Sequence, residues 1–232
     1  MNLFYSDNIN DTEAFLREDE YIHCCKVLRK KIGDQIHITD GKGRQAKAKI
    51  ESISKKEAHL TIIETIIHQP KESLTTIAIA PPKNRSRWEW FVEKSVEIGI
   101  DLIIPLRTKN SERIKINVDR SKKIMRSAAL QSLRYHHPNI SDLQSLDDMY
   151  RLLLSDQPDT NKYLAHYDPT HPHLRDISNG QENKLVIIGP EGDFTESEIE
   201  EALQNKIQLV NLSSNRLRTE TAGLIATNII IE

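Results

Sequence analysis

The stretch KLVIIGPEGDFTESEIEEALQ, residues 184–204, decides the fold class of this chain. It begins with a continuous apolar run, which is typical of a strand buried on both faces of a parallel sheet. A turn with two glycines follows, and Thr195 with Glu198 then fits a capping box at the start of a helix. A buried strand, a tight turn and a helix in this order predict an α/β domain.

The same alternation extends over most of the chain on both sides of this stretch. Further strands are predicted at residues 74–80, 102–106, 162–167 and 207–212. Further helices are predicted at residues 87–99, 120–133 and 146–154, and a last one at the C-terminus. Strands that alternate with helices indicate a mainly parallel sheet covered by helices.

Residues 1–68 follow a different pattern and are predicted to form a small half-open β-barrel. DQIHIT (34–39) alternates polar and apolar residues and ends in DGKG, a tight-turn signal between two strands. QAKAKIESI and AHLTIIETII alternate in the same way, and a short helical stretch, EDEYIHCCKVL, precedes them. The polar segment HQPKES (68–73) is the predicted linker. We therefore expect two domains, at 1–68 and 74–232.

The composition is that of an ordinary globular protein. The 232 residues are 38% apolar and 28% charged, with a formal net charge of −2. The cysteines, Cys24 and Cys25, are adjacent, which suits neither a disulfide nor a zinc-ribbon site, so no metal is expected. The first ten residues do not resemble a signal peptide, and no apolar run approaches 18 residues. We expect a cytoplasmic protein.

The charges are distributed unevenly along the chain. Residues 26–49 contain eight Lys or Arg against two acidic residues, and so do residues 107–126, whereas residues 182–201 contain seven acidic residues and one lysine. Such blocks are often only solvated faces. Two basic blocks also suit a protein that binds a polyanion on one side.

Three strand ends are candidates for a ligand site, because ligands bind at the carboxyl ends of parallel strands. They are YLAHYDP (163–169), VIIGPEG (186–192) and QLVNLSSNRLRTE (208–220). The second lacks the Lys-Ser/Thr pair of a phosphate loop, and its acidic Glu191 would repel a phosphate. Its glycines allow close approach of a ligand, although glycine also serves packing alone in such turns.

The third strand end contains the densest polar cluster of the chain, SSNRLRTETAGLIA (213–226). The structural interpretation is a helix start, in which a threonine caps the helix and Glu220 complements its dipole. That interpretation does not explain Arg216 and Arg218, because the positive end of a helix dipole disfavours cations. The arginines therefore favour a reaction site.

Taken together, IIGPEGDFTESEIE (187–200) and LSSNRLRTETAGLIA (212–226) resemble the SPOUT class of S-adenosylmethionine-dependent RNA methyltransferases. Within that class the chain is most similar to the ribosomal RNA small subunit methyltransferase E family, which methylates uridine at N3. HCCKVLRKKIGDQIHITDGKG (23–43) resembles the family's PUA-like RNA-binding barrel. WFVEKSVEIGIDLIIPL (90–106) and AALQSLRYHHP (128–138) match other parts of the family pattern.

The resemblance implies a trefoil knot in the C-terminal domain, a homodimer, and S-adenosylmethionine bound by main-chain groups of the three strand-end loops. The implied cofactor-binding residues are Ala165, His166, Ile188, Gly189, Pro190, Glu191, Gly192, Asn211, Leu212, Ser213 and Leu217. The implied partner is ribosomal RNA in the small ribosomal subunit. The candidates for RNA binding are Lys26, Arg29, Lys42, Arg44, Lys47, Arg85 and Arg134.

The chain also departs from the family pattern. The family commonly has glycine at the positions of Leu133 and Asp193, and glutamate at the position of Leu130. Ser213-Ser214 replaces a stretch that often contains glycine. These departures affect the helix end near residue 131 and the loops around the cofactor.

The expected activity is methylation of a uridine at N3 in 16S ribosomal RNA. The N3 proton must leave, and an arginine beside the base stabilises the anion that forms. Arg218 is the candidate for this role, with Thr219 beside it, and Glu220 is either the base or a residue that orients Arg218. One alternative is a SPOUT ribose 2′-O-methyltransferase. The other is an RNA-binding ribosome-assembly factor without catalysis.

Overall fold

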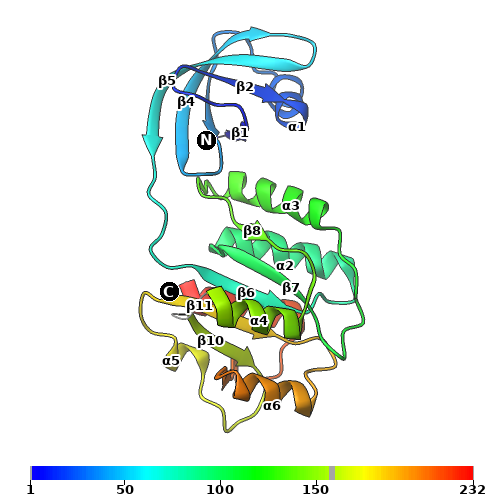
Figure 1. Cartoon of the computed structure of the whole chain (residues 1–232). Coiled ribbons are helices and arrows are strands. Elements are labelled where there is room, and N and C mark those ends of the chain that lie inside the picture. Colours follow the sequence, from blue (N-terminus) through cyan, green and yellow to red (C-terminus); the bar gives the residue numbers. More distant parts are fainter. Residues whose placement is uncertain (1, 157–159, 232) are drawn as a thin grey trace. The chain divides into compact units, whose positions relative to one another are not determined.

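The computed structural model describes residues 2–156 and 160–231, which form two compact units (Figure 1). The first unit comprises the chain up to Pro70 together with Arg126–His137. The second comprises Lys71–Met125 and the chain from Pro138 onward. The domain limits predicted from the sequence do not include the return of Arg126–His137 to the first unit.

The first unit contains a curled five-stranded sheet, as expected for a half-open barrel. Its strand order is β1-β3-β4-β5-β2, with β1 and β3 parallel and the other pairs antiparallel. Two register shifts between β4 and β5 mark bulges, which bend a sheet. The strands are β1 (Leu3–Tyr5), β2 (Glu13–Arg17), β3 (Gln35–Thr39), β4 (Arg44–Ile53) and β5 (Glu57–Ile67).

A short helical segment fills one side of this sheet. The helix α1 (Glu18–Tyr21) continues into the π-helix η1 (Ile22–Val27), and Tyr21 and Cys24 of this segment are buried with apolar residues of the strands. Burial raises the pKa of the Cys24 thiol to about 12, so this cysteine is a core residue rather than a nucleophile.

The second unit is built on a parallel sheet with the strand order β12-β10-β11-β6-β7-β8, and β9 also pairs with β7. Every residue of β6 is buried, as the continuous apolar run in the sequence predicts. The strands are β6 (Thr75–Ile79), β7 (Leu102–Arg107), β8 (Asn139–Ile140), β9 (Gln144–Ser145), β10 (Thr160–Ala165), β11 (Asn183–Ile188) and β12 (Gln208–Val210).

Helices cover this sheet on both faces. The helices α2 and α7 pack together, and a methyl group at Gly223 of α7 would lie only 2.6 Å from the ring of Phe91 in α2. Met149 of α4 and Ala202 of α6 belong to the apolar core on the other face. The helices are α2 (Arg85–Ile98), α3 (Val118–Gln131), α4 (Leu146–Asp156), α5 (Leu174–Ile177), α6 (Glu196–Gln204) and α7 (Thr219–Ile231).

The helix ends follow local signals in the sequence. The side chain of Asn84 caps the N-terminus of α2, and Gly99 ends this helix with a φ of 126°. Thr195 and Glu198 form the predicted capping box of α6. The α/β class, the parallel sheet and the small barrel are thus confirmed, whereas the trefoil knot stays a prediction.

Candidate functional site

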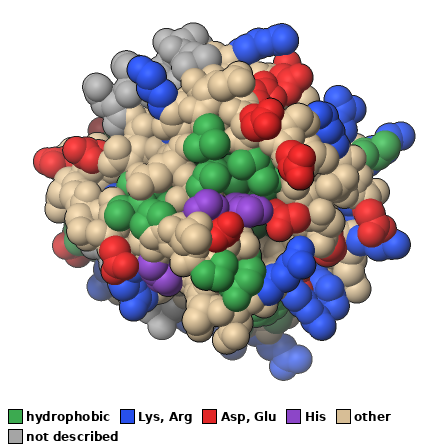
Figure 2. Space-filling view, turned by 90° about the horizontal axis from the view of Figure 1, so that it is seen from below, with side chains coloured by type: hydrophobic (Ala, Val, Ile, Leu, Met, Phe, Trp, Pro, Cys, Tyr) green, Lys and Arg blue, Asp and Glu red, His purple; other side chains and the backbone are tan. Residues whose placement is uncertain are grey.

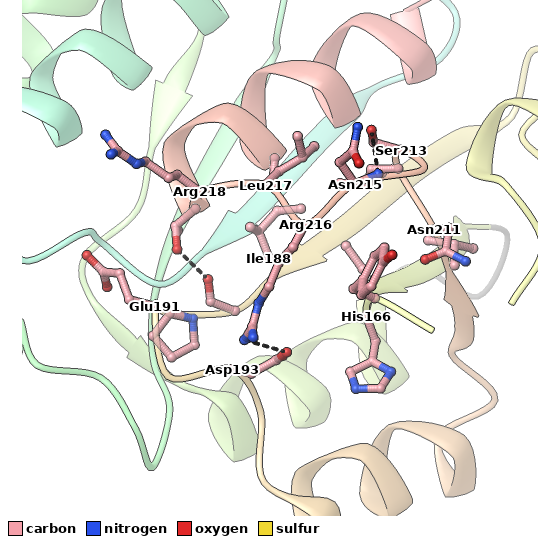
Figure 3. A pocket seen from close by; sticks show the side chains of 18 residues that line it. His166, Ile188, Glu191, Asp193, Asn211, Ser213, Asn215, Arg216, Leu217 and Arg218 are labelled. Atoms are coloured by element: carbon pink, nitrogen blue, oxygen red, sulfur yellow. Dashed lines mark hydrogen bonds and ion pairs between the residues drawn. The ribbon is translucent and has the colours of Figure 1, made fainter. Parts of the chain in front are cut away.

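A cavity of about 360 Å³ lies at the carboxyl edge of the parallel sheet, where three strands end (Figure 3). The residues that follow β10, β11 and β12 form its wall, together with the first turns of α7. The lining residues are Ala165, His166, Tyr167, Ile188, Gly189, Pro190, Glu191, Asp193, Val210, Asn211, Leu212, Ser213, Asn215, Arg216, Leu217, Arg218, Thr219 and Ala222.

The side chain of Asn211 fixes the wall that follows β10. Its amide nitrogen donates to the carbonyl oxygens of Asp168 and His171, and its oxygen accepts from the backbone N–H of Asp168. Hydrogen bonds from Thr170 hold the pKa of the Asp168 carboxyl below its usual range. The rings of His166 and His171 meet with their nitrogens 3.2 Å apart. Contacts within the protein therefore hold this wall in place.

The glycines of the loop after β11 serve packing within the protein. A methyl group at Gly189 would lie 2.9 Å from the ring of Phe194, which belongs to the core. A methyl group at Gly192 would lie 3.2 Å from Cβ of Asn110, and Gly192 does not line the cavity. Asn110 Nδ2 donates to the carbonyl oxygens of Gly192 and Asp193 at 3.1 and 3.0 Å. The loop is thus held from outside the cavity.

Two acidic side chains of this loop have defined partners. The carboxylate of Glu191 accepts from the backbone N–H of Lys83 at 3.1 Å. Asp193 accepts from the N–H of Phe194 at 2.9 Å and forms an ion pair with Arg216, with 3.6 Å between Oδ2 and the guanidinium nitrogen (Figure 3). The φ of Asp193 is 61°, in the left-handed region, which explains why glycine suits this position.

The start of α7 is attached to the loop after β11. Thr219 is buried, and its hydroxyl donates to the carbonyl oxygen of Gly189 at 3.1 Å. The structural interpretation of the sequence assigned a capping role to a threonine here. Thr219 instead connects two walls of the cavity, and the carbonyl of Arg218 accepts the first N–H bond of the helix, from Ala222.

Arg218 is the exposed side chain at this corner of the cavity. Within residues 2–156 and 160–231, its guanidinium has no hydrogen-bond or ion-pair partner. In Figure 3 the side chain points away from the pair that Arg216 forms with Asp193. An unpaired guanidinium beside a small-molecule cavity is suited to bind an anionic group.

Glu220 does not face the cavity. Its side chain is 7% exposed, and Oε1 lies 3.4 Å from Nε of Arg87 in the first turn of α2. Its other oxygen, Oε2, is buried and has no hydrogen-bond partner in the described part of the chain. Glu220 therefore contacts Arg87. The sequence does not predict this contact, because nothing local connects residues so far apart in the chain.

The structure brings ten of the eleven predicted cofactor residues together in one wall; Gly192 is the exception. Of the three predicted catalytic residues, Arg218 and Thr219 line the cavity and Glu220 does not. Tyr167, Asp193, Val210 and Ala222 also line the cavity and were not among the residues predicted to bind the cofactor. Their position beside the predicted strand ends was the available signal for the first three.

The residues predicted to bind RNA have varied surroundings. Arg44 forms an ion pair with Asp11 at 3.0 Å, and Arg85 forms one with Glu89 at 2.6 Å. Lys47 lies in β4 opposite Glu64. Lys26 lies over the ring of Tyr21, Arg29 and Lys42 are exposed, and Arg134 is half-buried. All of these lie in the first unit except Arg85, which lies in the second.

Neither a metal cluster nor a membrane-spanning helix occurs in the described ranges 2–156 and 160–231. The segment His171-Pro172-His173, which has the look of a metal pair, has other contacts. His171 meets His166, and the ring of His173 accepts from the N–H of Arg175 and donates to the carbonyl of Leu212.

Two family models match the chain. The RNA methyltransferase domain matches residues 69–231, and the RNA methyltransferase PUA domain matches residues 16–63. The first match covers the strands, helices and cavity of the parallel sheet, and the second covers most of the curled sheet. The order of the two domains is that expected from the sequence motifs.

Similar proteins agree with these models. The ribosomal RNA small subunit methyltransferase E of Bacillus subtilis is 29% identical over 91% of this chain and 87% of its own. A probable rRNA-methyltransferase from Porphyromonas gingivalis has a TM-score of 0.90 and 36% identity, covering 100% of this chain and 97% of its own. A ribosomal RNA small subunit methyltransferase E from Neisseria gonorrhoeae, bound to S-adenosyl methionine, has a TM-score of 0.82 and 26% identity, covering 98% and 95%. The chain therefore belongs to the ribosomal RNA small subunit methyltransferase E family of RNA methyltransferases.

Proposed function

We propose that this chain uses S-adenosylmethionine to methylate N3 of a uridine in small-subunit 16S ribosomal RNA. The observation that carries the proposal is the exposed Arg218, which has no ion-pair partner among the described residues, at the corner of a cavity between three strand ends. Family membership supports the reaction class, and the cavity supports the cofactor.

The cavity fits S-adenosylmethionine in size and in chemistry. Its volume of about 360 Å³ lies within the range of small-molecule sites, about 300–1,000 Å³. Apolar side chains on its wall suit the adenine ring and the methylene groups of the cofactor, and they are those of Ala165, Ile188, Val210, Leu212, Leu217 and Ala222. The wall carries two carboxylates, those of Glu191 and Asp193, and two guanidinium groups, those of Arg216 and Arg218. These charges can meet both the cationic and the anionic groups of S-adenosylmethionine.

When bound, S-adenosylmethionine supplies a methyl group that its sulfonium has already activated. The protein must then position the acceptor and stabilise its charge. Uridine N3 bears a proton and lies on the Watson–Crick edge, so the base must be unpaired or flipped out of a helix. Loss of the proton leaves negative charge on N3, O2 and O4.

Arg218 is the residue that we assign to this charge. A guanidinium is planar and always charged, and its fork of donors matches two neighbouring oxygens. Because the structure gives Arg218 no partner among the described residues, binding an anionic base would break no existing ion pair. Thr219 keeps the backbone at Arg218 in place through its hydrogen bond to Gly189.

We assign Glu220 a positioning role. Its burial and its contact with Arg87 support this role over that of the base, because a general base must reach the proton that it removes. Replacement of Glu220 by glutamine tests the assignment through the pH profile. A rate that recovers at high pH, where more uridine ionises unaided, would restore Glu220 as the base.

We infer the binding partner and the oligomeric state from family membership. We propose that the basic residues of the first unit bind ribosomal RNA and that the protein acts in the cytoplasm as a homodimer with a knotted C-terminal domain. Each neutralised phosphate adds about 0.7–0.9 to the salt slope of RNA binding. Replacement of Lys42, Arg44 and Lys47 by alanine should therefore flatten this slope, and sedimentation in solution tests the dimer.

The central experiment compares Arg218→Ala with the wild type in a methyl-transfer assay on ribosomal RNA. Removal of a preorganised donor to a developing anion costs on the order of 10²–10³ in rate. Arg218→Lys keeps the charge but not the planar fork, so it should not restore the rate. Affinity for S-adenosylmethionine, measured by calorimetry, should change little. A wild-type rate in Arg218→Ala would refute the assignment.

Arg175→Ala provides a matched control, because Arg175 is an exposed arginine of the same unit that does not line the cavity. Its rate should equal that of the wild type. Mass spectrometry and nuclease mapping of the product separate the alternatives. A methyl group on a ribose oxygen would indicate a 2′-O-methyltransferase, and failure of the wild type to bind S-adenosylmethionine would indicate a factor without catalysis.

A further inference from the structure

The segment 212–219 crosses the edge of the cavity as a strap attached near both ends. At one end, the carbonyl of Leu212 accepts from the ring of His173 at 3.1 Å, and the carbonyl of Ser214 accepts from the hydroxyl of Tyr167 at 3.2 Å. At the other end, Thr219 donates to Gly189. Between these attachments, Arg216 reaches across the cavity to Asp193 (Figure 3).

The two partners of this ion pair differ in how firmly they are held. Asp193 accepts a hydrogen bond from Phe194 through its side chain, and Asn110 binds its carbonyl oxygen. The side chain of Asp193 is 32% exposed, whereas that of Arg216 is 68% exposed. Asp193 is thus a fixed acceptor, and Arg216 is the part that can move away with the strap.

We propose that Asp193 and Arg216 form a clasp that holds the strap closed over the cavity and slows ligand exchange. Asp193 is a positioning residue in this proposal, because it acts on the ligand through Arg216. Both residues line the cavity, and their pair connects the strap to the loop after β11. A ligand that passes between the strap and this loop must therefore open the pair in order to enter and again in order to leave. The proposal rests on the proposed function in taking S-adenosylmethionine as that ligand.

The expected effect is kinetic and modest. A pair as exposed as this one changes an equilibrium by up to about five-fold, because water and salt screen its charges. Loss of the clasp should raise both the association and the dissociation rate constants of S-adenosylmethionine by about two- to five-fold. Because both rates rise together, the dissociation constant should stay within about two-fold of the wild type.

Stopped-flow binding of S-adenosylmethionine to Asp193→Asn, Arg216→Gln and the double variant tests the clasp. Asparagine tolerates the left-handed backbone and keeps an acceptor for the N–H of Phe194, so Asp193→Asn removes chiefly the charge. The double variant should match the single ones, because each breaks the same pair. Added salt should raise the association and dissociation rate constants of S-adenosylmethionine in the wild type but not in Asp193→Asn. Glu112→Gln, which breaks the exposed pair of Glu112 with Lys83 outside the cavity, should change neither rate.

The outcomes separate the clasp from a direct contact of Arg216 with the ligand. If Arg216→Gln raises the dissociation constant in the Asp193→Asn background too, Arg216 binds the ligand itself and the clasp is refuted. An unchanged association rate in Asp193→Asn refutes it as well.

A second measurement does not depend on the ligand. Hydrogen exchange of the amides at 213–217 in the free protein should be about two- to five-fold faster in Asp193→Asn than in the wild type. Equal exchange would overturn the clasp even if S-adenosylmethionine binds. If the wild type does not bind S-adenosylmethionine, the proposed cofactor fails, and the exchange rates still decide whether the clasp exists.

Discussion

The end of α3 and the loop after β11 hold a residue other than glycine in the same unusual backbone conformation. Leu133 has a φ of 57° and Asp193 has a φ of 61°, and both stand where the family commonly has glycine. Each lies in a different unit. The left-handed region costs an ordinary residue about 1–2 kcal/mol, so both positions contain strain.

The two regions differ in what stabilises them. At the end of α3, the N–H of Arg134 donates to the carbonyl of Ala129 at 2.8 Å, which leaves Leu133 at the turn of a Schellman motif. The side chain of Leu133 makes no hydrogen bond, and the residue is 40% exposed. At Asp193 the carboxylate itself accepts from Phe194 and pairs with Arg216. A polar side chain thus offsets strain that an apolar one does not.

The segment that follows Leu133 is held by backbone hydrogen bonds and by the packing of rings on glycines. The backbone of Tyr135 and His137 pairs with Gly43 and Gly41 in the turn between β3 and β4. A methyl group at Gly41 or Gly43 would lie 2.6 Å from the ring of His137 or His136. Ring packing and backbone hydrogen bonds together attach the end of α3 to the barrel, whereas side-chain hydrogen bonds of Asn110 and Asp193 hold the loop after β11.

The largest loss of stability is expected for Gly43→Ala, which disrupts the packing of His136 on Gly43. The new methyl group would meet the ring of His136 and lie 2.7 Å from the carbonyl oxygen of His68, at a φ of 102°. Overpacking and backbone strain together should lower the free energy of unfolding by roughly 3–5 kcal/mol. Gly33→Ala is the control, because Gly33 has a φ of 92° but nothing within 4 Å of a new methyl group. Equal losses in denaturant unfolding would show that packing on Gly43 is unimportant.

The next largest effect is a loss of stability at low pH, which we expect to begin at a higher pH in the first unit than in the second. Burial, followed by the charges of Arg126 and Arg134, lowers the pKa of His137 from 6.5 to about 4, although Asp40 opposes the shift. The unfolded state then binds a proton that the folded state does not. The first unit should therefore lose up to about 3 kcal/mol as pH falls from about 6.5 to 4.

In the second unit, the carboxyl groups with a lowered pKa, those of Glu89 and Asp168, titrate at lower pH than His137 would in the unfolded chain. The hydrogen bond from Arg120 lowers the pKa of Glu89 to about 2, and the stability that it adds is lost only between about pH 4.5 and 2. Hydrogen exchange at pH 7 and 5 should show loosening confined to the first unit. His137→Phe removes the titrating group and should abolish this difference, and loosening that persists in the variant would assign it to another group.

A smaller loss is expected when the hydrogen bonds of the loop after β11 are removed. Asn110→Ala deletes the donors to Gly192 and Asp193, and each such bond contributes about 1 kcal/mol. The free energy of unfolding should fall by about 2 kcal/mol in thermal or denaturant melts. Asn179→Ala, which removes one long bond of 3.5 Å to Asp176, is the control and should cost little. A loss no larger than this would mean that Asn110 does not hold the loop.

The smallest expected change in stability tests the comparison of Leu133 with Asp193 directly. Leu133→Gly removes the left-handed strain without removing a hydrogen bond, so it should raise the free energy of unfolding by about 1 kcal/mol. Asp193→Gly relieves the same strain but loses the bond to Phe194 and the pair with Arg216, so it should give no gain. Thermal melts of both variants measure these changes in the free energy of unfolding. A gain of equal size in both would mean that the Asp193 carboxylate contributes nothing.

The sequence alone determined the fold class and the place of the cavity. Buried strands, capping signals and glycine turns act over a few residues, so β11, its loop and α6 follow from residues 184–204. Because parallel strands end at one edge, three strand ends predicted one site, and ten of the eleven cofactor candidates line it. The family motifs added the cofactor and the reaction.

Only the tertiary structure decided which side chains meet. Glu220 contacts Arg87 rather than Arg218, Gly192 packs on Asn110 outside the cavity, and Asp193 pairs with Arg216. Likewise, the segment after α3 returns to the barrel through His136 and His137. These partners are far apart in the chain, so no local propensity links them. Their contacts depend on how the strands and helices pack, and that packing is a property of the whole fold.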